Sequence, residues 1–537
     1  MQYDYLILGG GSAGAVLAAR LSADPNVSVC LIEAGREARD IFVRAPALVA
    51  AMVSGRPPIH NWAYRTTPQA GLNGRRGFQP RGRGLGGSSA INAMLYVRGQ
   101  PQDYDDWAEM GAQGWDWQSC KPWFLASERN MRGATDWHGY AGPLQVGDQR
   151  RPRPISRAFV QACAAVQCAP IADFNGPEQM GAGLYQVTQF WDGPRKGERC
   201  SVAAAYLHPV MARPNLTVMT RARAEKILTT DARATGALIR QGRKQLQITA
   251  RREVIVSAGA FGSPQLLMLS GIGPVDHLRE HGIEPVLDLP GVGANLHDHL
   301  DYVISYTSPR RDVVGLNPRG LLRLARAGAG WRKHGEGLFA SPMAEGGAFL
   351  RSDPSLDRPD LQLHFVVGIV DQHMRKPHLA DGWSVHVCAM RPKSRGTLRL
   401  ACADPRAAPL IDPAFLADPR DQALMLRAAR LLEQITDASS LDPWRGRKLY
   451  PHDGTDAALM ADIRARADTI YHPVGTCRMG RDEMAVVDPQ LCVRGIAGLR
   501  VVDASVMPQV VSGNTNAPTV MIAERAANFI RSDRSGD

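Results

Sequence analysis

The sequence predicts an α/β fold, α+β over the whole chain, built from more than one structural unit. The chain has 537 residues, well above the ~100–200 of a usual domain. Residues 3–35 read as strand, glycine turn, helix and strand, which is the order of a parallel-sheet unit. Two later segments, 252–256 and 499–503, read as further buried strands that each lead toward a helix. The region 306–464 lacks such units and is more irregular, so we assign it to a second domain.

The N-terminal unit is the most regular passage. Tyr5–Leu8 is a short apolar strand, and the glycine-rich stretch 9–14 follows it directly. Ala15–Leu21 contains the small and aliphatic residues of a buried helix, and Val27–Ile32 is a second strand. A G-x-G-x-x-G pattern between strand and helix predicts a βαβ unit that binds a dinucleotide. The structural alternative is a glycine-rich turn of an ordinary α/β protein.

Each glycine of the pattern has a distinct expected role. Gly9 permits the tight turn, Gly11 lets the backbone approach a pyrophosphate, and Gly14 lets the helix pack closely on the strand. The helix N-terminus adds amide donors and the positive end of its dipole. Glu33 ends the second strand, and its carboxylate can accept a hydrogen bond from a ribose hydroxyl. The same carboxylate would repel a 2′-phosphate, which argues against NADP.

Three further segments carry local signals. The stretch Arg81–Asn92 combines flexible glycines with a Ser-Ser pair, which predicts an anion-binding nest with an N-cap that leads into an apolar helix. A simple capped helix start is the alternative. Ser263–Ser270 predicts a helix with Ser at the cap and Pro at its first position. A C-terminal helix is predicted from about Pro518 to Ile530.

Composition excludes several classes of protein. Hydrophobic residues are 44% and charged residues 21% of the chain, which is ordinary for a globular protein and wrong for disorder. Lys and Arg number 63 against 52 Asp and Glu, which gives a formal charge of +11. These cations are dispersed rather than clustered, so no nucleic-acid partner is expected.

Cysteine usage and apolar segments bear on the compartment. The nine cysteines form no C-x-x-C pair, and the spacing of Cys163 and Cys168 does not suit zinc. We therefore expect free, mostly buried thiols in a reducing compartment. The longest apolar stretch, Ala45–Val53, is well short of the ~20 residues that span a bilayer, and no signal peptide is recognisable. The expected location is cytoplasmic, with peripheral contact to the inner membrane face as a further expectation.

Four separated motifs occur in order along the chain. Residues 83–92 read RGLGGSSAIN, and residues 262–273 read GSPQLLMLSGIG. Residues 471–476 read YHPVGT, and residues 513–519 read GNTNAPT. With the N-terminal unit, they resemble the glucose-methanol-choline (GMC) family of FAD-dependent oxidoreductases nearly from end to end. Within that family the chain is most similar to bacterial alcohol dehydrogenases of alkane oxidation, and next to choline dehydrogenases.

The resemblance implies FAD as the cofactor and no metal. It implies a Rossmann-like FAD-binding domain made of residues 1–155, 200–305 and 465–537. Residues 156–199 and 306–464 would form a discontinuous substrate-binding domain on an antiparallel sheet. The implied FAD contacts are Gly9, Gly11, Ser12, Ala13, Gly14, Glu33, Ala34, Trp62, Gly84, Leu85, Gly87, Ser88, Asn92, Ala93, Met94, Leu95, Ala224, Tyr471, Asp503, Ala504 and Thr515.

The last two motifs supply the implied catalytic pair, His472 and Asn514. A neutral imidazole can accept the hydroxyl proton of an alcohol, and an amide N–H can donate to the developing alkoxide. The alternatives are a core histidine bonded to backbone and a helix cap. Many relatives carry a second histidine at the position of Asn514. Some carry a histidine bonded covalently to the flavin at the position of Ile91, and because isoleucine has no nucleophile we expect non-covalent FAD.

The implied reaction is oxidation of a primary alcohol, medium- or long-chain aliphatic or aromatic, to the aldehyde. Electrons would pass to a quinone or another non-oxygen acceptor. Three other activities stay open on the same fold. These are choline dehydrogenase activity, an alcohol oxidase that produces hydrogen peroxide, and a non-redox hydroxynitrile lyase.

Other histidines have weaker signals. His297 and His299 lie on one face of an extended segment and are a conceivable half of a metal site, although no third ligand has a recognisable spacing. Hydrogen bonding within the domain is the favoured alternative. His334, His373 and His378 lie in polar, loop-like sequence and are expected to be solvated.

The segment 319–333 offers a means of touching a membrane. At helical spacing, one side carries Leu321, Leu324, Ala325 and Gly328, and another carries Arg319, Arg323 and Arg326. Trp331 suits an interface, and the basic side suits anionic headgroups. The alternative is a solvated helix packed on the second domain.

Overall fold

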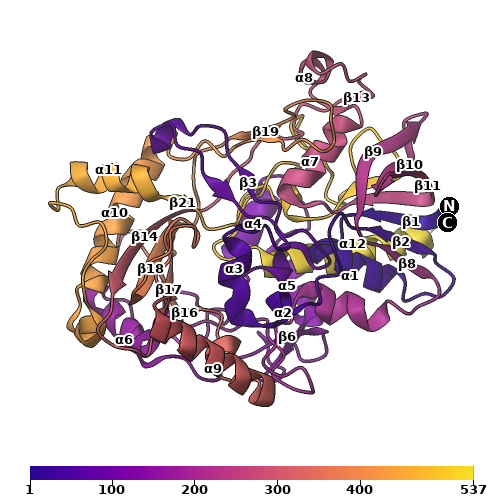
Figure 1. The fold of residues 1–537 in the computed structure, drawn as a ribbon. Helices are drawn as coiled ribbons and strands as arrows, with labels where there is room; N and C mark the ends of the chain where they lie inside the picture. Colours follow the sequence, from indigo (N-terminus) through magenta and orange to yellow (C-terminus); the bar gives the residue numbers. More distant parts are fainter. Residues whose placement is uncertain (536–537) are drawn as a thin grey trace.

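Two seven-stranded sheets organise the chain in this computed structural model, which describes residues 1–535. Figure 1 shows the first sheet at the right, beside both termini, and the second at the left. The two sheets are each covered by helices, and the main hydrophobic core surrounds the first sheet. A second core lies against the other sheet.

The first sheet confirms the predicted parallel unit. Its strand order is β8-β2-β1-β11-β10-β9, with β22 paired to β11. Ile7 of β1 lies between Leu31 of β2 and Ile255 of β11, in parallel register on both sides. Such strands are buried on both faces and therefore read as continuous apolar runs. The bounds are β1 (Gln2–Leu8), β2 (Val29–Ile32), β8 (Leu216–Met219), β9 (Ala222–Thr230), β10 (Arg233–Gln241), β11 (Lys244–Val256) and β22 (Leu499–Val501), flanked by α1 (Ser12–Leu21) and α12 (Asn516–Ser535).

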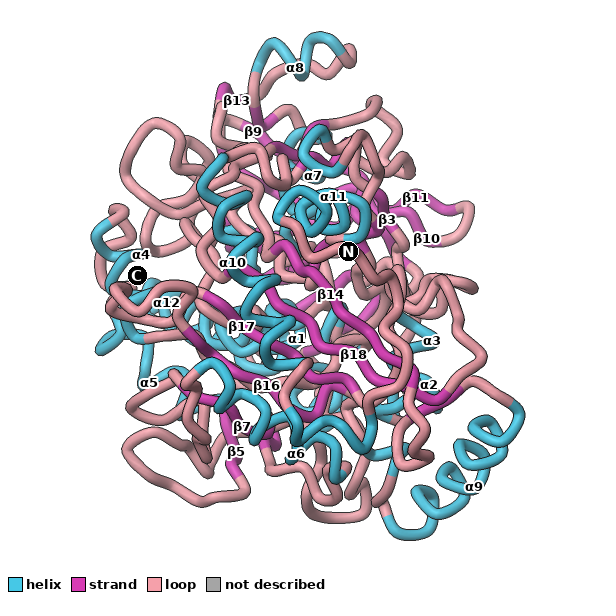
Figure 2. Tube along the Cα trace, turned by 90° about the vertical axis from the view of Figure 1, so that its left-hand side faces the viewer, coloured by secondary structure: helices cyan, strands magenta, loops and turns pink. Residues whose placement is uncertain are grey.

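The second sheet is antiparallel, as predicted, in the order β21-β14-β18-β17-β16-β7 with β15 beside β18. Figure 2 shows α10 crossing its outer face. The predicted division at residues 305 and 306 falls inside β14, and β21 comes from a segment assigned to the first domain. The bounds are β7 (Gly181–Leu184), β14 (Leu300–Thr307), β15 (Val314–Gly315), β16 (Ala344–Leu350), β17 (Leu361–Val366), β18 (Asp381–Ala389) and β21 (Asp468–Thr469), covered by α6 (Pro154–Ala162), α10 (Pro419–Thr436) and α11 (Asp456–Arg466).

Smaller elements connect the two sheets. Four two-stranded ladders pair β3 (Tyr64–Arg65) with β4 (Phe78–Gln79), β5 (Glu128–Asn130) with β6 (Leu144–Val146), β12 (Ile272–Gly273) with β13 (Leu287–Asp288), and β19 (Thr397–Arg399) with β20 (Leu410–Asp412). The remaining α-helices are α2 (Ile41–Arg44), α3 (Val49–Val53), α4 (Pro101–Glu109), α5 (Trp117–Ser127), α7 (Gly259–Leu269), α8 (Val275–Glu280) and α9 (Pro318–His334). Across residues 1–535, every helix is too short or too polar to cross a membrane.

Two predicted helix starts are wrong. Helix α7 begins at Gly259, four residues before the predicted cap, and Pro264 lies inside it. The carbonyl of Ala260, which the missing N–H of Pro264 leaves unbonded, accepts a hydrogen bond from the Thr476 hydroxyl at 2.6 Å. After the second glycine stretch, only a 3-10 turn forms over Gly87–Ala90, and no α-helix follows it directly.

Helix α9 projects from the edge of the molecule in Figure 2, and its sides differ from the prediction. Trp331 is buried, and its indole N–H donates to the Gly197 carbonyl at 2.8 Å. On the predicted apolar side, Leu321 is exposed, whereas Leu324 and Gly328 are half-buried. Arg323 forms an ion pair with Asp381 instead of facing solvent freely. The prediction that Trp331 suits a membrane interface is therefore wrong, because Trp331 is buried and anchors the helix to the body.

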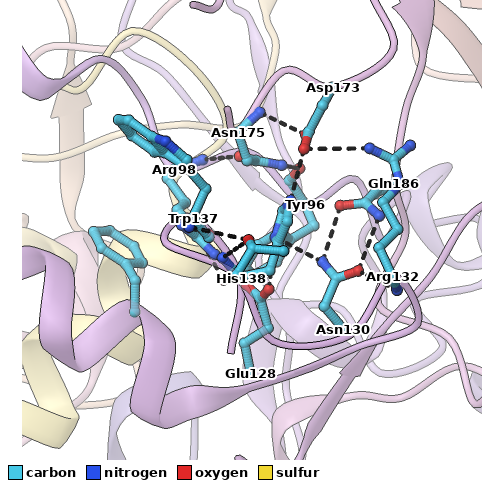
Figure 3. A network of polar contacts seen from close by, with 12 residues as sticks. Tyr96, Arg98, Glu128, Asn130, Arg132, Trp137, His138, Asp173, Asn175 and Gln186 are labelled. Carbon is cyan, nitrogen blue, oxygen red and sulfur yellow. Dashed lines mark hydrogen bonds and ion pairs between the residues drawn. The ribbon is translucent and has the colours of Figure 1, made fainter. Parts of the chain in front are cut away.

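A buried polar network joins segments next to the first sheet (Figure 3). Arg98 forms an ion pair with Glu128. His138 lies 2.8 Å from Glu128 through Nδ1 and 2.6 Å from Asp173 through Nε2. The Asn175 amide donates to the Tyr96 carbonyl and accepts from the Arg98 amide, each at 3.0 Å. The network therefore fixes the backbone at Tyr96 and Arg98, directly after residues 92–95.

All nine cysteines are free thiols. Seven of them are buried, Cys492 is half-buried and Cys402 is exposed. Burial raises the pKa of Cys163 and Cys168, which keeps both thiols protonated. The expectation of free, mostly buried cysteines is confirmed.

Candidate active site

One large cavity of about 940 Å³ lies between the two sheets. Its walls include Leu8 and Ile32 of the first sheet and His364, Val366 and His386 of the second. A cavity of this size, near the upper end of the usual range for ligand sites, has room for a dinucleotide and a smaller molecule beside it. The site is thus shared by both parts of the chain.

The first glycine turn has the geometry that the sequence predicts. Gly9 has φ of +115°, which side-chain-bearing residues rarely adopt. A Cβ on Gly14 would lie 1.9 Å from the Gly9 carbonyl oxygen, so only glycine allows α1 to pack this closely. Helix α1 begins at Ser12, which lines the cavity together with Gly11 and Ala13. The backbone N–H groups of the first helical turn, which have no partner within the helix, therefore lie at the cavity wall.

The second glycine stretch packs directly on this turn. The Gly86 amide donates to the Gly10 carbonyl at 2.8 Å. Gly87 has φ of +51°, and a Cβ there would lie 2.8 Å from the Cα of Gly11. The two stretches form a double-layered cradle, in which side chains at the contact would push the layers apart.

Two buried carboxylates hold the cradle in place. Glu33 accepts hydrogen bonds from the amides of Gly10 at 3.0 Å and Gly35 at 2.6 Å. Asp503 accepts from the Gly259 amide at 2.9 Å and from the Ser263 hydroxyl at 2.5 Å. Burial raises the pKa of both carboxyl groups, against the lowering effect of these donors. Both side chains line the cavity and retain lone pairs for a ligand hydroxyl.

Most residues predicted to contact the cofactor line this cavity. Gly14, Gly84 and Leu85 do not, because they lie behind its wall and support it. The predicted residues that the cavity brings together are Gly9, Gly11, Ser12, Ala13, Glu33, Ala34, Trp62, Gly87, Ser88, Asn92, Ala93, Met94, Leu95, Ala224, Tyr471, Asp503, Ala504 and Thr515.

The cradle fits the FAD that the motifs imply. The helix N-terminus and glycine backbone suit the pyrophosphate, and Glu33 suits the adenosine ribose. Ile91 is buried in the same wall, with no nucleophile to offer the flavin. These residues would hold FAD by non-covalent contacts alone.

The predicted catalytic pair lies together in the cavity. The Asn514 amide nitrogen is 3.1 Å from Nε2 of His472. The backbone amide of His472 donates to Asp298 at 2.8 Å, which fixes the residue on its turn. Burial lowers the pKa of His472 well below its usual value, and the neighbouring imidazoles of His299 and His364 lower it further. The His472 imidazole is therefore neutral near pH 7 and able to accept a proton.

A second imidazole lies behind His472. Nδ1 of His299 is 3.0 Å from Nδ1 of His472, and the two rings are almost perpendicular. Nε2 of His299 is 2.9 Å from the Met390 carbonyl oxygen. Burial lowers the pKa of His299 to about 4, so it is neutral as well. The sequence favours hydrogen bonding within the domain for His299, but it does not reveal that the partner is His472.

His297 is held by hydrogen bonds to the backbone. Its Nδ1 lies 2.7 Å from the Asn295 carbonyl, and its Nε2 accepts from the Val510 amide at 2.9 Å. This is the hydrogen bonding within the domain that the sequence favours. Within residues 1–535, no three His, Cys, Asp or Glu side chains gather as a metal site.

The prediction of a solvated His373 is wrong. His373 is buried in the cavity wall, and its Nδ1 lies 2.7 Å from the Tyr471 hydroxyl. Its ring also packs against Phe78. The loop turns inward through left-handed backbone at Gln372, His373 and Met374, which a polar sequence does not reveal. His334 is exposed as expected, and His378 is half-buried beside Asp371.

Sequence reasoning missed the polar face of the second sheet. Gln362 and His364 lie two residues apart on β17, and His364 is directly opposite His386 of β18. Both ring nitrogens of His364 are buried without a partner among the described residues. The alternation of Leu361, Gln362 and Leu363 was the available signal, because polar residues at period two mark one face of a strand.

Comparisons with known proteins agree with this geometry. Family models described as GMC oxidoreductase match residues 3–301 and 392–523. The chain is 45% identical to an alcohol dehydrogenase [acceptor] of Pseudomonas putida, over 98% of this chain and 95% of that protein. It is 42% identical to the mitochondrial choline dehydrogenase of Mus musculus, over 99% of this chain and 89% of that protein.

Solved structures give the same result. Pyridoxine 4-oxidase from Mesorbium loti superposes with a TM-score of 0.88 at 32% identity, over 99% of both chains. A formate oxidase superposes with a TM-score of 0.91 at 26% identity, over 100% of this chain and 99% of that one. The chain therefore belongs to the GMC oxidoreductase family, whose cofactor is FAD.

Proposed function

We propose that this protein oxidises a neutral primary alcohol, medium- or long-chain aliphatic or aromatic, to its aldehyde. The observation that carries the proposal is the pair of His472 and Asn514, 3.1 Å apart in the cavity that the cradle opens into. The relative from Pseudomonas putida, an alcohol dehydrogenase [acceptor], supports a non-oxygen electron acceptor such as a quinone.

His472 and Asn514 have different roles at the substrate hydroxyl. Nε2 of the neutral His472 accepts the hydroxyl proton, and the Asn514 amide N–H donates to the oxygen as negative charge develops on it. FAD, when bound, supplies the acceptor for the hydride that leaves the substrate carbon. The buried surroundings exclude water from the alkoxide and strengthen both interactions.

The walls favour an uncharged, largely apolar substrate. Outside the cradle much of the cavity wall is aliphatic, beside the imidazoles of the second-sheet side, and the aliphatic side chains include Val314, Leu316, Pro342, Met343, Val366, Ile369 and Val370. Its carboxylates, within the described chain, are Glu33 and Asp503, which belong to the cradle. A quaternary ammonium substrate prefers aromatic faces, often with a carboxylate. Choline is therefore the second candidate, kept because the mouse relative is a choline dehydrogenase.

The direct test is reduction of the bound flavin without oxygen. The holoenzyme is mixed anaerobically with 1-alkanols of increasing length, benzyl alcohol and choline, and loss of the flavin absorbance is followed. We expect rapid bleaching by the neutral alcohols and slow bleaching by choline. Bleaching by choline alone would replace the proposed substrate class, and no bleaching by any alcohol would favour a lyase.

The same preparation separates a dehydrogenase from an oxidase. Turnover under air is compared with turnover on an artificial quinone without oxygen, and hydrogen peroxide is measured. We expect fast quinone reduction and little peroxide. Peroxide in equal amount to the aldehyde would identify an oxidase.

A further inference from the structure

A continuous chain of hydrogen bonds passes through His472 and ends at a backbone carbonyl on each side. On one side it runs through His299 to the carbonyl of Met390. On the other it runs through Asn514, Gln362 and Tyr185 to the carbonyl of Leu363. Because a carbonyl oxygen only accepts hydrogen bonds, each end fixes the direction of the bonds that lead to it.

The Met390 end determines where the His472 proton sits. The Met390 carbonyl is 2.9 Å from Nε2 of His299, so that nitrogen carries the hydrogen. A neutral imidazole has one N–H, which leaves Nδ1 of His299 with a lone pair. Nδ1 of His472 lies 3.0 Å from Nδ1 of His299 and must donate to its lone pair. Nε2 of His472 is consequently without a proton.

The Leu363 end determines how the Asn514 amide is turned. The Tyr185 hydroxyl donates to the Leu363 carbonyl at 2.7 Å, so its oxygen accepts from Gln362 at 3.1 Å. The Gln362 group that faces Tyr185 is therefore the NH₂, and the same nitrogen lies 3.1 Å from Asn514. Asn514 must present its carbonyl oxygen there, which turns its own NH₂ toward Nε2 of His472.

We infer that His299 and Gln362 are positioning residues, which hold His472 as the Nδ1–H tautomer and Asn514 with its N–H toward the substrate oxygen. The inference rests on the proposed function, in which Nε2 of His472 receives the hydroxyl proton. The two ends of the chain fix the same arrangement independently. The opposite tautomer would carry a proton on Nε2 and would be unable to accept another.

The arrangement also serves the charged product of proton transfer. After transfer, the alcohol proton is bonded to Nε2, and Nδ1 keeps the hydrogen that it already donates to His299. No other proton has to move at that moment. The lone pair of His299 then faces a cationic donor, and such hydrogen bonds are stronger than neutral ones.

The tautomer can be read without any turnover. In FAD-loaded enzyme labelled with ¹⁵N-histidine, NMR distinguishes a protonated ring nitrogen from a bare one, and His472→Ala identifies the His472 signals. We expect Nδ1 protonated and Nε2 bare in the resting enzyme at neutral pH. A protonated Nε2 would overturn the inference, whatever the activity is.

Matched variants test the positioning role. His299→Asn keeps an acceptor atom close to the position of Nδ1, whereas His299→Leu keeps volume without an acceptor. We expect His299→Leu to slow flavin reduction by about 10²-fold, at the lower end of what a placed base contributes, with a smaller change in KM than in kcat. His299→Asn should stay within about tenfold of wild type, since it retains the acceptor. Equal rates in His299→Leu and wild type would overturn the inference.

Gln362 provides a second, independent variant. Gln362→Glu removes the N–H that Asn514 accepts, so the Asn514 amide should turn over and the rate should fall further than in Gln362→Met. A Gln362→Glu enzyme as fast as wild type would contradict the role of Gln362. If wild-type flavin is not reduced by any alcohol, the proposed function fails, while the NMR result still decides the tautomer.

Discussion

At the scale of single residues, the proposed chemistry depends on one buried imidazole, that of His472. His472→Ala removes the proton acceptor, and we expect flavin reduction to slow by about 10²–10⁴-fold, the usual contribution of a general base. Asn514→Ala removes a donor to the alkoxide and should cost about 10–10³-fold. Anaerobic stopped-flow reduction measures both, and FAD content serves as the control. A His472→Ala enzyme with the wild-type rate would require another base.

The pH dependence follows from the environment of His472. Burial lowers its pKa well below the usual 6.5, so the accepting, neutral form persists into acidic solution. The rate of flavin reduction should therefore stay level through pH 6.5 and decline only at lower pH. A pH profile of the reduction rate checks this expectation. A decline centred at or above pH 6.5 would show that the base titrates as an ordinary histidine.

Ile91 sets the attachment of the cofactor. It lies buried in the cavity wall and offers no atom that could bond to the flavin. Precipitation of the holoenzyme with acid should release all its FAD into the supernatant, measured by absorbance. Yellow colour retained by the washed, denatured protein would contradict this expectation and point to another attachment residue.

At the scale of elements, helix α9 presents a mixed apolar and basic surface. Leu321 and Leu322 are each 52% exposed. Arg319, Arg326 and Arg332 are exposed on the same helix. Asp381 accepts a hydrogen bond from Asn317 and forms an ion pair with Arg323 at the start of the helix. The exposed Leu379 lies two residues before Asp381 in the sequence. Helix α9 contacts β15, whose Val314 lines the cavity, so membrane contact at α9 would bring lipid close to the proposed substrate site.

We expect the protein to sediment with anionic liposomes at low salt, and less as salt is added. Changing Arg319, Arg326 and Arg332 to Glu should abolish sedimentation. A control with the same charge change uses the exposed Lys226, Arg243 and Lys244 on β9–β11, far from α9. Equal losses of sedimentation in both variants would indicate a general charge effect. A wild-type protein that stays in the supernatant at low salt would contradict membrane contact through α9.

The polar network of Figure 3 should make stability depend on pH. Burial lowers the pKa of His138, but its bonds to Asp173 and Glu128 raise it overall. Because the pKa of His138 is raised in the folded state, its protonation stabilises the fold. This stabilisation is complete at pH below the pKa of the unfolded state and is lost as pH rises through the pKa of the folded state. Urea unfolding of wild type and His138→Gln should differ by about 1–3 kcal/mol at pH 6 and converge in alkaline solution. A constant difference would contradict protonation of His138.

At the scale of the whole molecule, the sequence predicted those features that are determined by residues close together in the sequence. The first βαβ unit is local, so its strands, helix and glycine roles follow from residues 3–35. Family motifs located His472 and Asn514. The contact of His472 with His299 could not be predicted, because 173 positions separate them and long-range pairings, among them that of β14 with β21, bring them together. The inward turn at His373 depends on distant Phe78 and Tyr471 in the same way.

The order of the strands has a consequence for synthesis. The chain leaves the first sheet after β2, gives β7 to the second, returns for β8–β11, leaves again for β14–β21 and returns for β22 and α12. Neither sheet is complete until nearly the whole chain has left the ribosome. Domains made of one continuous segment can fold one after another as they emerge. Here the strands already synthesised keep unpaired edges until the later strands emerge. Chaperone dependence during translation, and the failure of separately expressed halves, are the outcomes that this interleaving favours.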